Sequence, residues 1–279
     1  MLKSKSEFLN RLVFTGMAVA VMTFLFFFAY NPWIHALLVI LTMVLSGIGV
    51  WEYGKLASAK GIPVDQRRMV IVTMLGTFAL YAAFVYPHKA PLIFPLIILG
   101  LISLFIARFH ACKNAILSVA AEFFGVCYLS FPLSMLLAIL YAPSLGKGGR
   151  FWLIYLIAVT KVSDIGGYFV GKLWGKRPLA LELSPKKTIE GAIGGFCFAV
   201  SLSVFFSVIG SQHGLSLAQS VWLGILIGIL AQVGDLAESL LKRDAMVKDS
   251  NKIPGVGGVL DLVDSLLLTS PMVYFFIQF

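Results

Sequence analysis

The chain carries long apolar stretches at regular intervals, and these restrict its fold more than any other feature. A helix needs about 20 residues to cross about 30 Å of hydrocarbon, because each residue adds about 1.5 Å. Nine stretches qualify, although the last is shorter: residues 12–30, 33–51, 69–86, 91–107, 115–141, 151–172, 189–209, 217–234 and 265–279. We therefore predict an all-α fold, a polytopic integral membrane bundle of about nine transmembrane helices.

The composition agrees with this class. Of the 279 residues, 59% are hydrophobic and 13% are charged, compared with about 25% charged in soluble domains. In a membrane protein, a net charge of +9 is better explained by loop topology and anionic headgroups than by nucleic acid, so we expect no nucleic-acid partner. The cysteines are isolated and predict neither a disulfide nor a zinc site: Cys112, Cys127 and Cys197.

The basic residues predict the orientation, because Lys and Arg in short loops stay on the cytoplasmic side of a membrane. With a cytoplasmic N-terminus, the predicted cytoplasmic segments hold all of the 22 Lys and Arg except four: Lys89, Lys147, Arg150 and Lys161, the last within a span. We therefore predict a multi-pass protein of the inner (cytoplasmic) membrane with its N-terminus in the cytoplasm.

The acidic residues divide the chain into two parts. Only four of the 13 precede Asp164: Glu7, Glu52, Asp65 and Glu122. We predict that residues 1–145 are transmembrane scaffold and that residues 146–279 form a catalytic transmembrane region with a polar site facing the cytoplasm.

The predicted scaffold contains one charged connecting segment and one acid within a span. We expect the segment from Glu52 to Arg68, which is mixed in charge and contains Gly61 and Pro63, to be a solvated turn. Glu122 lies within a span, where an acid either pairs with a polar neighbour or lies near a wet cavity. The sequence leaves both interpretations open.

The first polar cluster lies near the end of the sixth apolar stretch. Lys161, Asp164 and Tyr168 are three and four residues apart, so they share one face of a helix. This spacing fits an internal ion pair within a span, and it also fits a polar cavity open to the cytoplasm. The run Gly166–Lys172 has the spacing of a phosphate-binding P-loop, but Leu173 replaces the hydroxyl residue that would bind Mg²⁺. The run also ends an apolar helix, whereas a P-loop follows a strand. For both reasons we reject a P-loop.

The second cluster is the segment SPKKTIEG. Ser184 or Thr188 could cap the helix that follows, which would place Lys186 and Lys187 at a helix N-terminus, where cations are disfavoured. A bound polyanion would reverse that penalty, so the segment is a candidate phosphate site. Without a ligand, the two lysines are a basic cytoplasmic flank.

The third and densest cluster is residues 232–264, which place five aspartates, one glutamate and four Lys or Arg between two apolar stretches. Glu238 and Lys242, four residues apart, fit a structural ion pair. Asp261 and Asp264, three apart, project from one side of the last helix. Carboxylates brought together repel each other unless cations intervene, and Mg²⁺ prefers such oxygen ligands together with substrate phosphates.

Together the clusters supply carboxylates for a metal ion, including Asp235 at the cytoplasmic end of the eighth stretch, and lysines and an arginine for phosphates. Glycines allow a ligand to approach the backbone closely. This combination is typical of phosphoryl or nucleotidyl transfer, in which positioning and charge neutralisation supply most of the catalysis.

At these residues the chain resembles the phosphatidate cytidylyltransferase (CDP-diacylglycerol synthase) family. The family signature S-x-x-K-R-x4-K-D, followed by P-x-H-G-G-x-x-D-R-x-D, is matched by Ser239, Lys242, Arg243, Lys248, Asp249, Pro254, Gly257, Gly258, Asp261 and Asp264. Upstream, SPKKTIEG resembles the segment S-P-K-K-T-x-E-G, and Asp164 to Lys176 resembles D-x-x-A-Y-x-x-G-[RK]-x-x-G-K. The resemblance covers roughly residues 160 to 271.

The chain departs from this pattern at two side chains and in one loop. Val256 occupies the usual His position and Leu262 the usual Arg position, and the loop between Asp249 and Pro254 is one residue shorter. A general-acid role for that His is therefore excluded, and a phosphate contact by that Arg must come from elsewhere or be absent. Since the aspartates and the Lys-Lys pair remain, we favour an active enzyme.

The resemblance implies Mg²⁺-dependent conversion of CTP and phosphatidic acid to CDP-diacylglycerol and pyrophosphate, with a second cation left open. It implies metal binding by Asp235, Asp261 and Asp264. It implies substrate binding by Ser184, Lys186, Lys187, Lys242, Arg243, Gly257 and Gly258, and catalytic roles for Asp164, Lys248 and Asp249. Membrane lipids are expected partners, and a homodimer is left open.

Two alternatives remain at this stage. A CTP-dependent lipid or polyprenol kinase would share the bundle, the nucleotide and Mg²⁺, but it would release CDP. A secondary transporter of an anionic metabolite would use the lysines and glycine-rich helices as its site, although such transporters show internal repeats that we do not find here.

Overall fold

The computed structural model describes residues 23–109, 113–247 and 258–278. The long helices are α2 (Pro32–Ala59), α3 (Gln66–Val85), α4 (Ala90–Ile106), α5 (Ala115–Tyr141), α6 (Gly149–Trp174), α7 (Ile189–Ile209), α8 (Leu217–Asp244) and α9 (Val259–Gln278). The other elements are short: the 3₁₀ helices η1 (Pro87–Lys89), η2 (Pro143–Gly148) and η3 (Ser211–His213), and the strands β1 (Pro178–Ala180) and β2 (Ser184–Thr188). The predicted all-α class is confirmed.

Among the described residues, seven helices are long and apolar enough to cross a membrane, and α4 contributes a shorter apolar segment, Ile93–Ile106. The predicted stretches 115–141 and 189–209 coincide with α5 and α7. The stretch 115–141 is one continuous helix even though Pro132 lies inside it. The first predicted span, residues 12–30, lies mostly outside the described residues, so the count of nine and the side of the N-terminus stay predictions.

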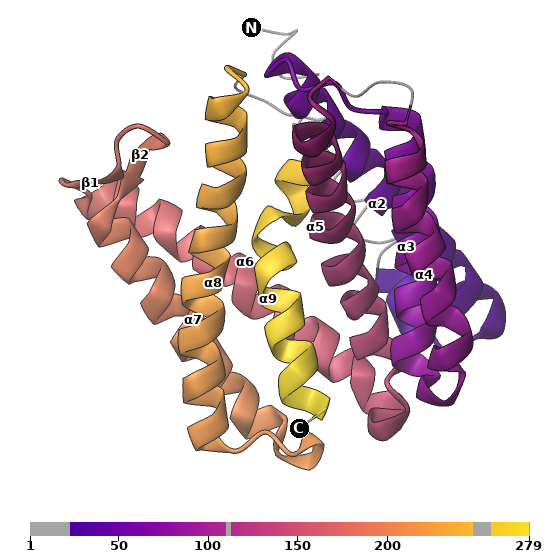
Figure 1. The fold of residues 1–279 in the computed structure, drawn as a ribbon. Helices are drawn as coiled ribbons and strands as arrows, with labels where there is room; N and C mark the ends of the chain where they lie inside the picture. Colours follow the sequence, from indigo (N-terminus) through magenta and orange to yellow (C-terminus); the bar gives the residue numbers. More distant parts are fainter. Residues whose placement is uncertain (1–22, 110–112, 248–257, 279) are drawn as a thin grey trace, which may run out of the picture.

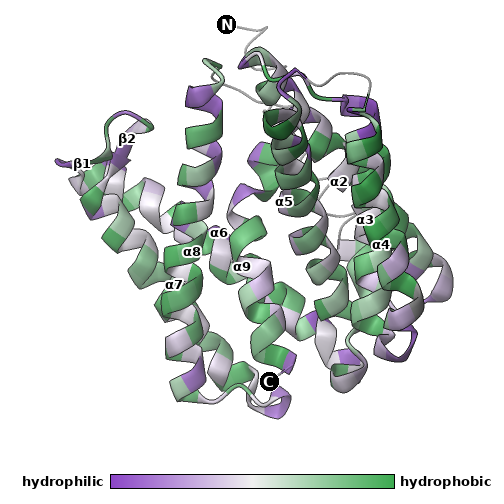
Figure 2. Cartoon of the chain, in the orientation of Figure 1, coloured by the Kyte–Doolittle hydropathy of each residue, from purple (hydrophilic) through white to green (hydrophobic). Residues whose placement is uncertain are grey.

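The helices form a bundle in which α9 is central. Figure 1 shows α9 between α7 and α8 on one side and α2 to α5 on the other, while α6 crosses behind it. The strands β1 and β2 pair as an antiparallel hairpin between α6 and α7, at the same end of the bundle as the C-terminal end of α8 (Figure 1). Hydrophobic residues predominate along the helices, and hydrophilic residues gather at the helix ends and the hairpin (Figure 2).

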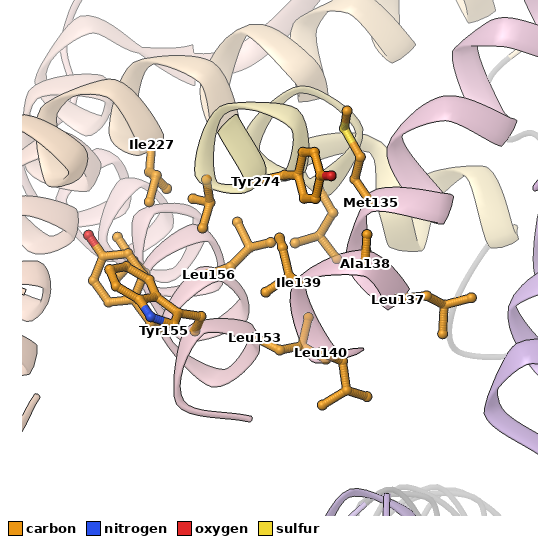
Figure 3. Packing of buried hydrophobic residues seen from close by; sticks show 14 of the residues in the cluster. Met135, Leu137, Ala138, Ile139, Leu140, Leu153, Tyr155, Leu156, Ile227 and Tyr274 are labelled. Atoms are coloured by element: carbon orange, nitrogen blue, oxygen red, sulfur yellow. The ribbon is translucent and has the colours of Figure 1, made fainter. Parts of the chain in front are cut away.

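The main core forms where α5, α6 and α9 meet. Figure 3 shows Met135 and Ala138 of α5 near Leu156 of α6 and Tyr274 of α9, all of them buried. Between membrane helices, close van der Waals packing supplies the attraction that transfer from water supplies in soluble proteins. This core fixes α6 and α9 against each other, and both helices carry acidic residues of the candidate site.

Small residues bring α6 and α7 together closely enough to hold the hairpin beside them. A Cβ added at Gly195 would lie 2.5 Å from the backbone oxygen of Ser163, and one at Gly191 would lie 2.7 Å from that of Gly167. Neither position can hold a side chain without separating the helices. The first two turns of α7 therefore pack directly on the backbone of α6.

The prediction of a solvated turn from Glu52 to Arg68 is wrong over its first half. α2 continues to Ala59, and the side chain of Glu52 is fully buried, where it accepts hydrogen bonds from the backbone N–H groups of Val259 and Leu260. Hydropathy marked the end of the apolar stretch and not the end of the helix. Glutamate is a good helix former, so a helix can extend past its apolar face.

Glu122 pairs with a polar neighbour, which is one of the two interpretations left open. Its fully buried carboxylate forms an ion pair with Arg108 and accepts a hydrogen bond of 2.7 Å from the backbone N–H of Asp65. These contacts join the end of α4, the start of α5 and the turn before α3. Glu122 therefore serves the packing of these helix ends against one another.

Candidate active site

A cavity of about 460 Å³ lies between α6, α7, α8 and the hairpin. Acidic, basic and apolar residues line it together: Ser163, Asp164, Gly167, Tyr168, Gly171, Lys172, Leu179, Lys186, Lys187, Thr188, Gly191, Ala192, Gln232 and Asp235. The first and second predicted clusters thus meet in one cavity although the end of α6 and the strand β1 separate them in the chain. The run Gly166–Lys172 is helical throughout, which agrees with the rejection of a P-loop.

The hairpin brings two lysines to this cavity. Thr188 ends β2 and caps α7, because its hydroxyl accepts a hydrogen bond of 3.1 Å from the backbone N–H of Gly191. The cap holds the backbone next to Lys187. Lys187 Nζ lies 2.5 Å from the carboxylate of Asp235 on α8. Lys186 also lines the cavity. One lysine of the predicted basic pair, Lys187, therefore has an acidic partner in the structure.

Next to Asp164 of the cavity lining, a polar network links α6 to α9. Lys161 lies 3.5 Å from Asp164 on the same helix and donates a hydrogen bond of 3.0 Å to the hydroxyl of Ser265. The Ser265 hydroxyl in turn donates to Asp164 at 3.3 Å. The predicted Lys161–Asp164 pair is confirmed, and Asp164 also lines the cavity. That the cavity opens to the cytoplasm stays a prediction.

Three carboxylates converge where α8 meets α9. One oxygen from each of Asp235, Glu238 and Asp264 lies within 4.8 Å of the other two. Glu238 and Asp264 are buried, and Asp235 is half-buried at the cavity wall. Hard divalent cations such as Mg²⁺ take oxygen ligands of this kind, usually one or two carboxylates together with substrate phosphates. The donor set therefore fits such an ion.

Lys242 lies beside this group and pairs with two acids. Its Nζ lies 2.8 Å from Glu238, which confirms the predicted i,i+4 pair, and it also contacts Asp261. The other oxygen of Asp261 accepts a hydrogen bond of 2.7 Å from the backbone N–H of Gly258. Lys242 thus connects the C-terminal part of α8 to the first turn of α9.

The predicted site residues differ in where they lie. Asp164, Lys186, Lys187 and Asp235 line the cavity, and Asp264 adjoins Asp235. Lys242 and Asp261 form the ion pair described above, Arg243 donates to the backbone oxygen of Leu183 at 3.0 Å, and Ser184 opens β2. Three further predicted residues fall outside the described residues: Lys248, Asp249 and Gly257.

Sequence reasoning left several of these residues out of the predicted site. Glu238 stands three residues after Asp235, so helical spacing alone could have added it to the acidic set. Lys161 and Ser265 meet only through the packing of α6 on α9, and no spacing in the sequence indicates that contact. Leu262, at the usual Arg position, is exposed, and its backbone oxygen accepts from Lys161 at 3.3 Å.

The site lies deeper in the bundle than expected. The predicted stretch ended at residue 234, but α8 continues to Asp244. Asp235 is nine residues before that end, which corresponds to about 14 Å along the helix axis. The carboxylates are therefore embedded between helices and do not lie at a loop.

The fold and the site define a polytopic helical membrane protein whose cavity is suited to a metal ion and phosphate groups. Comparison with known proteins identifies the family. The chain belongs to the cytidylyltransferase family, whose sequence model matches residues 9–279. The predicted family and the predicted enzyme class, a nucleotidyltransferase, are confirmed.

Individual relatives carry a more specific name. The chain is 33% identical over 276 residues to a phosphatidate cytidylyltransferase of Chlamydia pneumoniae, an alignment that covers 92% of this chain and 88% of the relative. It is 34% identical over 261 residues to the Synechocystis sp. protein of that name, covering 82% and 84%. It is 37% identical over 160 residues to the Bacillus subtilis protein, covering 57% and 56%.

Proposed function

We propose that this chain carries out the reaction for which these relatives are named. A phosphate oxygen of phosphatidic acid attacks the α-phosphorus of CTP, the new P–O bond forms as the bond to the β-phosphate oxygen breaks, and pyrophosphate leaves. The product is CDP-diacylglycerol. The observation that carries the proposal is the cavity wall where Lys187 meets Asp235, beside two further carboxylates.

The lysines provide for phosphate binding. Lys186 and Lys187 both line the cavity, so a triphosphate there would meet two ammonium groups held on one strand. Lys187 would exchange the carboxylate of Asp235 for phosphate oxygens. Charge-assisted bonds to phosphate stabilise the leaving pyrophosphate as negative charge develops on it. The attacking phosphate oxygen is already anionic near neutral pH, so no general base is required.

Asp235, Glu238 and Asp264 would hold Mg²⁺, which when bound neutralises phosphate charge. Asp261 belonged to the predicted metal set, and its contacts with Lys242 and Gly258 support a role in shaping that set. Asp164, which lines the cavity, would orient Lys161 and Ser265 behind it. The apolar lining residues, such as Leu179 and Ala192, suit a substrate that brings acyl chains next to its phosphate.

The hairpin end of the bundle would face the cytoplasm. In the described residues, the connections at the opposite end hold only Lys89 and Lys147, with Arg150 in the first turn of α6, and the remaining Lys and Arg of the connections lie at the hairpin end. This asymmetry supports a cytoplasmic site in the inner membrane. The CTP of the cell would then reach the cavity directly.

The test uses detergent-solubilised protein with labelled CTP, phosphatidic acid and Mg²⁺. We expect CDP-diacylglycerol and pyrophosphate to form, and EDTA to abolish the reaction until Mg²⁺ is restored. Asp264→Asn should lower turnover by at least about 100-fold, because a ligand to the ion is lost. Asp244→Asn is the matched control, since this acid on α8 is exposed and pairs with Lys60.

The products separate the alternatives. Release of CDP in place of pyrophosphate would indicate a CTP-dependent kinase. No turnover of CTP without a membrane gradient would favour a transporter. Equal turnover in Asp264→Asn and the wild type would contradict the assignment of this carboxylate.

A further inference from the structure

Glu52 is a buried acid in the part of the chain that was predicted to be scaffold. It lies on α2, its side chain is 0% exposed, and both of its oxygens accept hydrogen bonds. The donors are the backbone N–H groups of Val259, at 3.1 Å, and Leu260, at 2.8 Å. These are the first two residues of α9.

These contacts supply hydrogen-bond acceptors to the start of α9. The first N–H groups of any helix lack partners within the helix. Here the helix starts inside the protein, because Val259 and Leu260 are buried, and a buried N–H without an acceptor destabilises the folded state. Asp261 accepts from Gly258. Carboxylates thus satisfy the N–H groups of three consecutive residues, and they lie where the helix dipole favours negative charge.

The first turn of α9 also determines where Asp264 lies. Asp264 is four residues after Leu260, about 6 Å further along the axis. Its carboxylate meets those of Asp235 and Glu238, which belong to α8. A shift of α9 along its own axis would move Asp264 but neither of the other two. The spacing of the acidic group therefore depends on what holds the start of α9.

We propose that Glu52 is a positioning residue: by holding the first turn of α9, it sets the distance of Asp264 from Asp235 and Glu238 and so the affinity of the site for a divalent cation. The inference rests on the proposed function for its catalytic consequence. It adds a residue from the N-terminal half to the machinery of the site.

Glu122 provides a matched control. It is also a fully buried glutamate in the N-terminal half and also accepts a backbone N–H, that of Asp65. Its ion pair is with Arg108, and its contacts join α3, α4 and α5 at their ends. A variant at Glu122 therefore tests the cost of disturbing a buried carboxylate away from α9.

The experiment compares Glu52→Gln with Glu122→Gln in folded, detergent-solubilised protein. Glutamine keeps one acceptor oxygen but turns an N–H donor towards the backbone donors. Two quantities are measured: the affinity of substrate-free protein for Mn²⁺, from the electron paramagnetic resonance signal of the free ion, and the Mg²⁺ concentration that gives half-maximal activity. We expect Glu52→Gln to weaken both by about 10-fold, as for other residues that orient metal ligands, and Glu122→Gln to leave both unchanged.

Each outcome decides the inference. Wild-type values for both quantities in Glu52→Gln, or equal losses in the two variants, overturn it. If Glu52→Gln does not fold, Glu52→Asp, which keeps both acceptors on a shorter side chain, takes its place under the same criteria. An inactive wild type would refute the proposed function while Mn²⁺ affinity still tests the positioning role, and a wild type that fails in both measurements overturns both proposals.

Discussion

The contact between α8 and α9 at Gly234 allows a direct test of the site geometry. A Cβ at this position would lie 2.6 Å from the backbone oxygen of Asp264 and 3.1 Å from Cα of Ser265. Packed heavy atoms lie about 3.5 Å apart or more. Gly234→Ala must therefore separate the two helices by roughly 0.5 to 1 Å, at the point where Asp264 and Asp235 face each other.

The effect on stability should be smaller than the effect on activity. Overpacking of this kind costs about 1–3 kcal/mol, and replacement of glycine within a helix returns up to about 1 kcal/mol. We expect a net loss of about 1–2 kcal/mol in the free energy of unfolding. Because a misplacement of about 1 Å can reduce a rate about 100-fold, we expect kcat/KM to fall by about 10- to 100-fold.

Gly76→Ala is the matched control. Its added Cβ on α3 would lie 3.7 Å from Cβ of Ser130, an ordinary contact, so activity and thermal stability should equal or exceed those of the wild type. Formation of CDP-diacylglycerol from labelled CTP and thermal unfolding in detergent measure the two effects. Wild-type activity in Gly234→Ala would contradict the view that the close contact of α8 with α9 sets the spacing of the carboxylates.

Two further predictions concern the hairpin. Thr188→Ala removes the cap of α7 and should lower the free energy of unfolding by about 1 kcal/mol. Ser216→Ala, the control, removes the cap of α8 at the other end of the bundle. Thermal unfolding should show similar losses in both variants, while only Thr188→Ala should lower the rate of CDP-diacylglycerol formation. Lys187→Met frees Asp235 from its ion pair and should raise the Mn²⁺ affinity of substrate-free protein about fivefold, for a pair worth about 1 kcal/mol, while raising KM for CTP. Lys186→Met should raise KM alone, and weaker Mn²⁺ binding in Lys187→Met would contradict the role given to that pair.

Most of the helices could be predicted because the bilayer imposes a length and an apolar composition on each span. The stretches that match α5 and α7 contain few charges, so hydropathy alone defines their ends. It fails for α2 and α8, which continue past their apolar stretches into charged residues. Hydropathy measures preference for lipid, and it does not register a carboxylate such as Glu52 that is buried against backbone N–H groups.

The site could be predicted in its residue types but not in its pairings. The density of charge after Gln232 indicated a metal and phosphate site, and helical spacing gave the pairs Lys161–Asp164 and Glu238–Lys242. The contact of Lys187 with Asp235 joins a strand to a distant helix, and that of Lys161 with Ser265 depends on how α6 packs on α9. Such contacts follow from tertiary packing, which a single sequence does not specify.

These pairings suggest how an acidic group can persist between membrane helices before any substrate arrives. Lys161, Lys187 and Lys242 each contact at least one carboxylate of the region, so lysines of the chain itself offset part of the negative charge. A cation that binds the acids would release Lys187, and the released ammonium group would then favour phosphate. Since coupling between two ligands is reciprocal, a triphosphate that binds Lys187 would likewise free Asp235 for the cation. The proposed site is thus arranged to take up metal and nucleotide together.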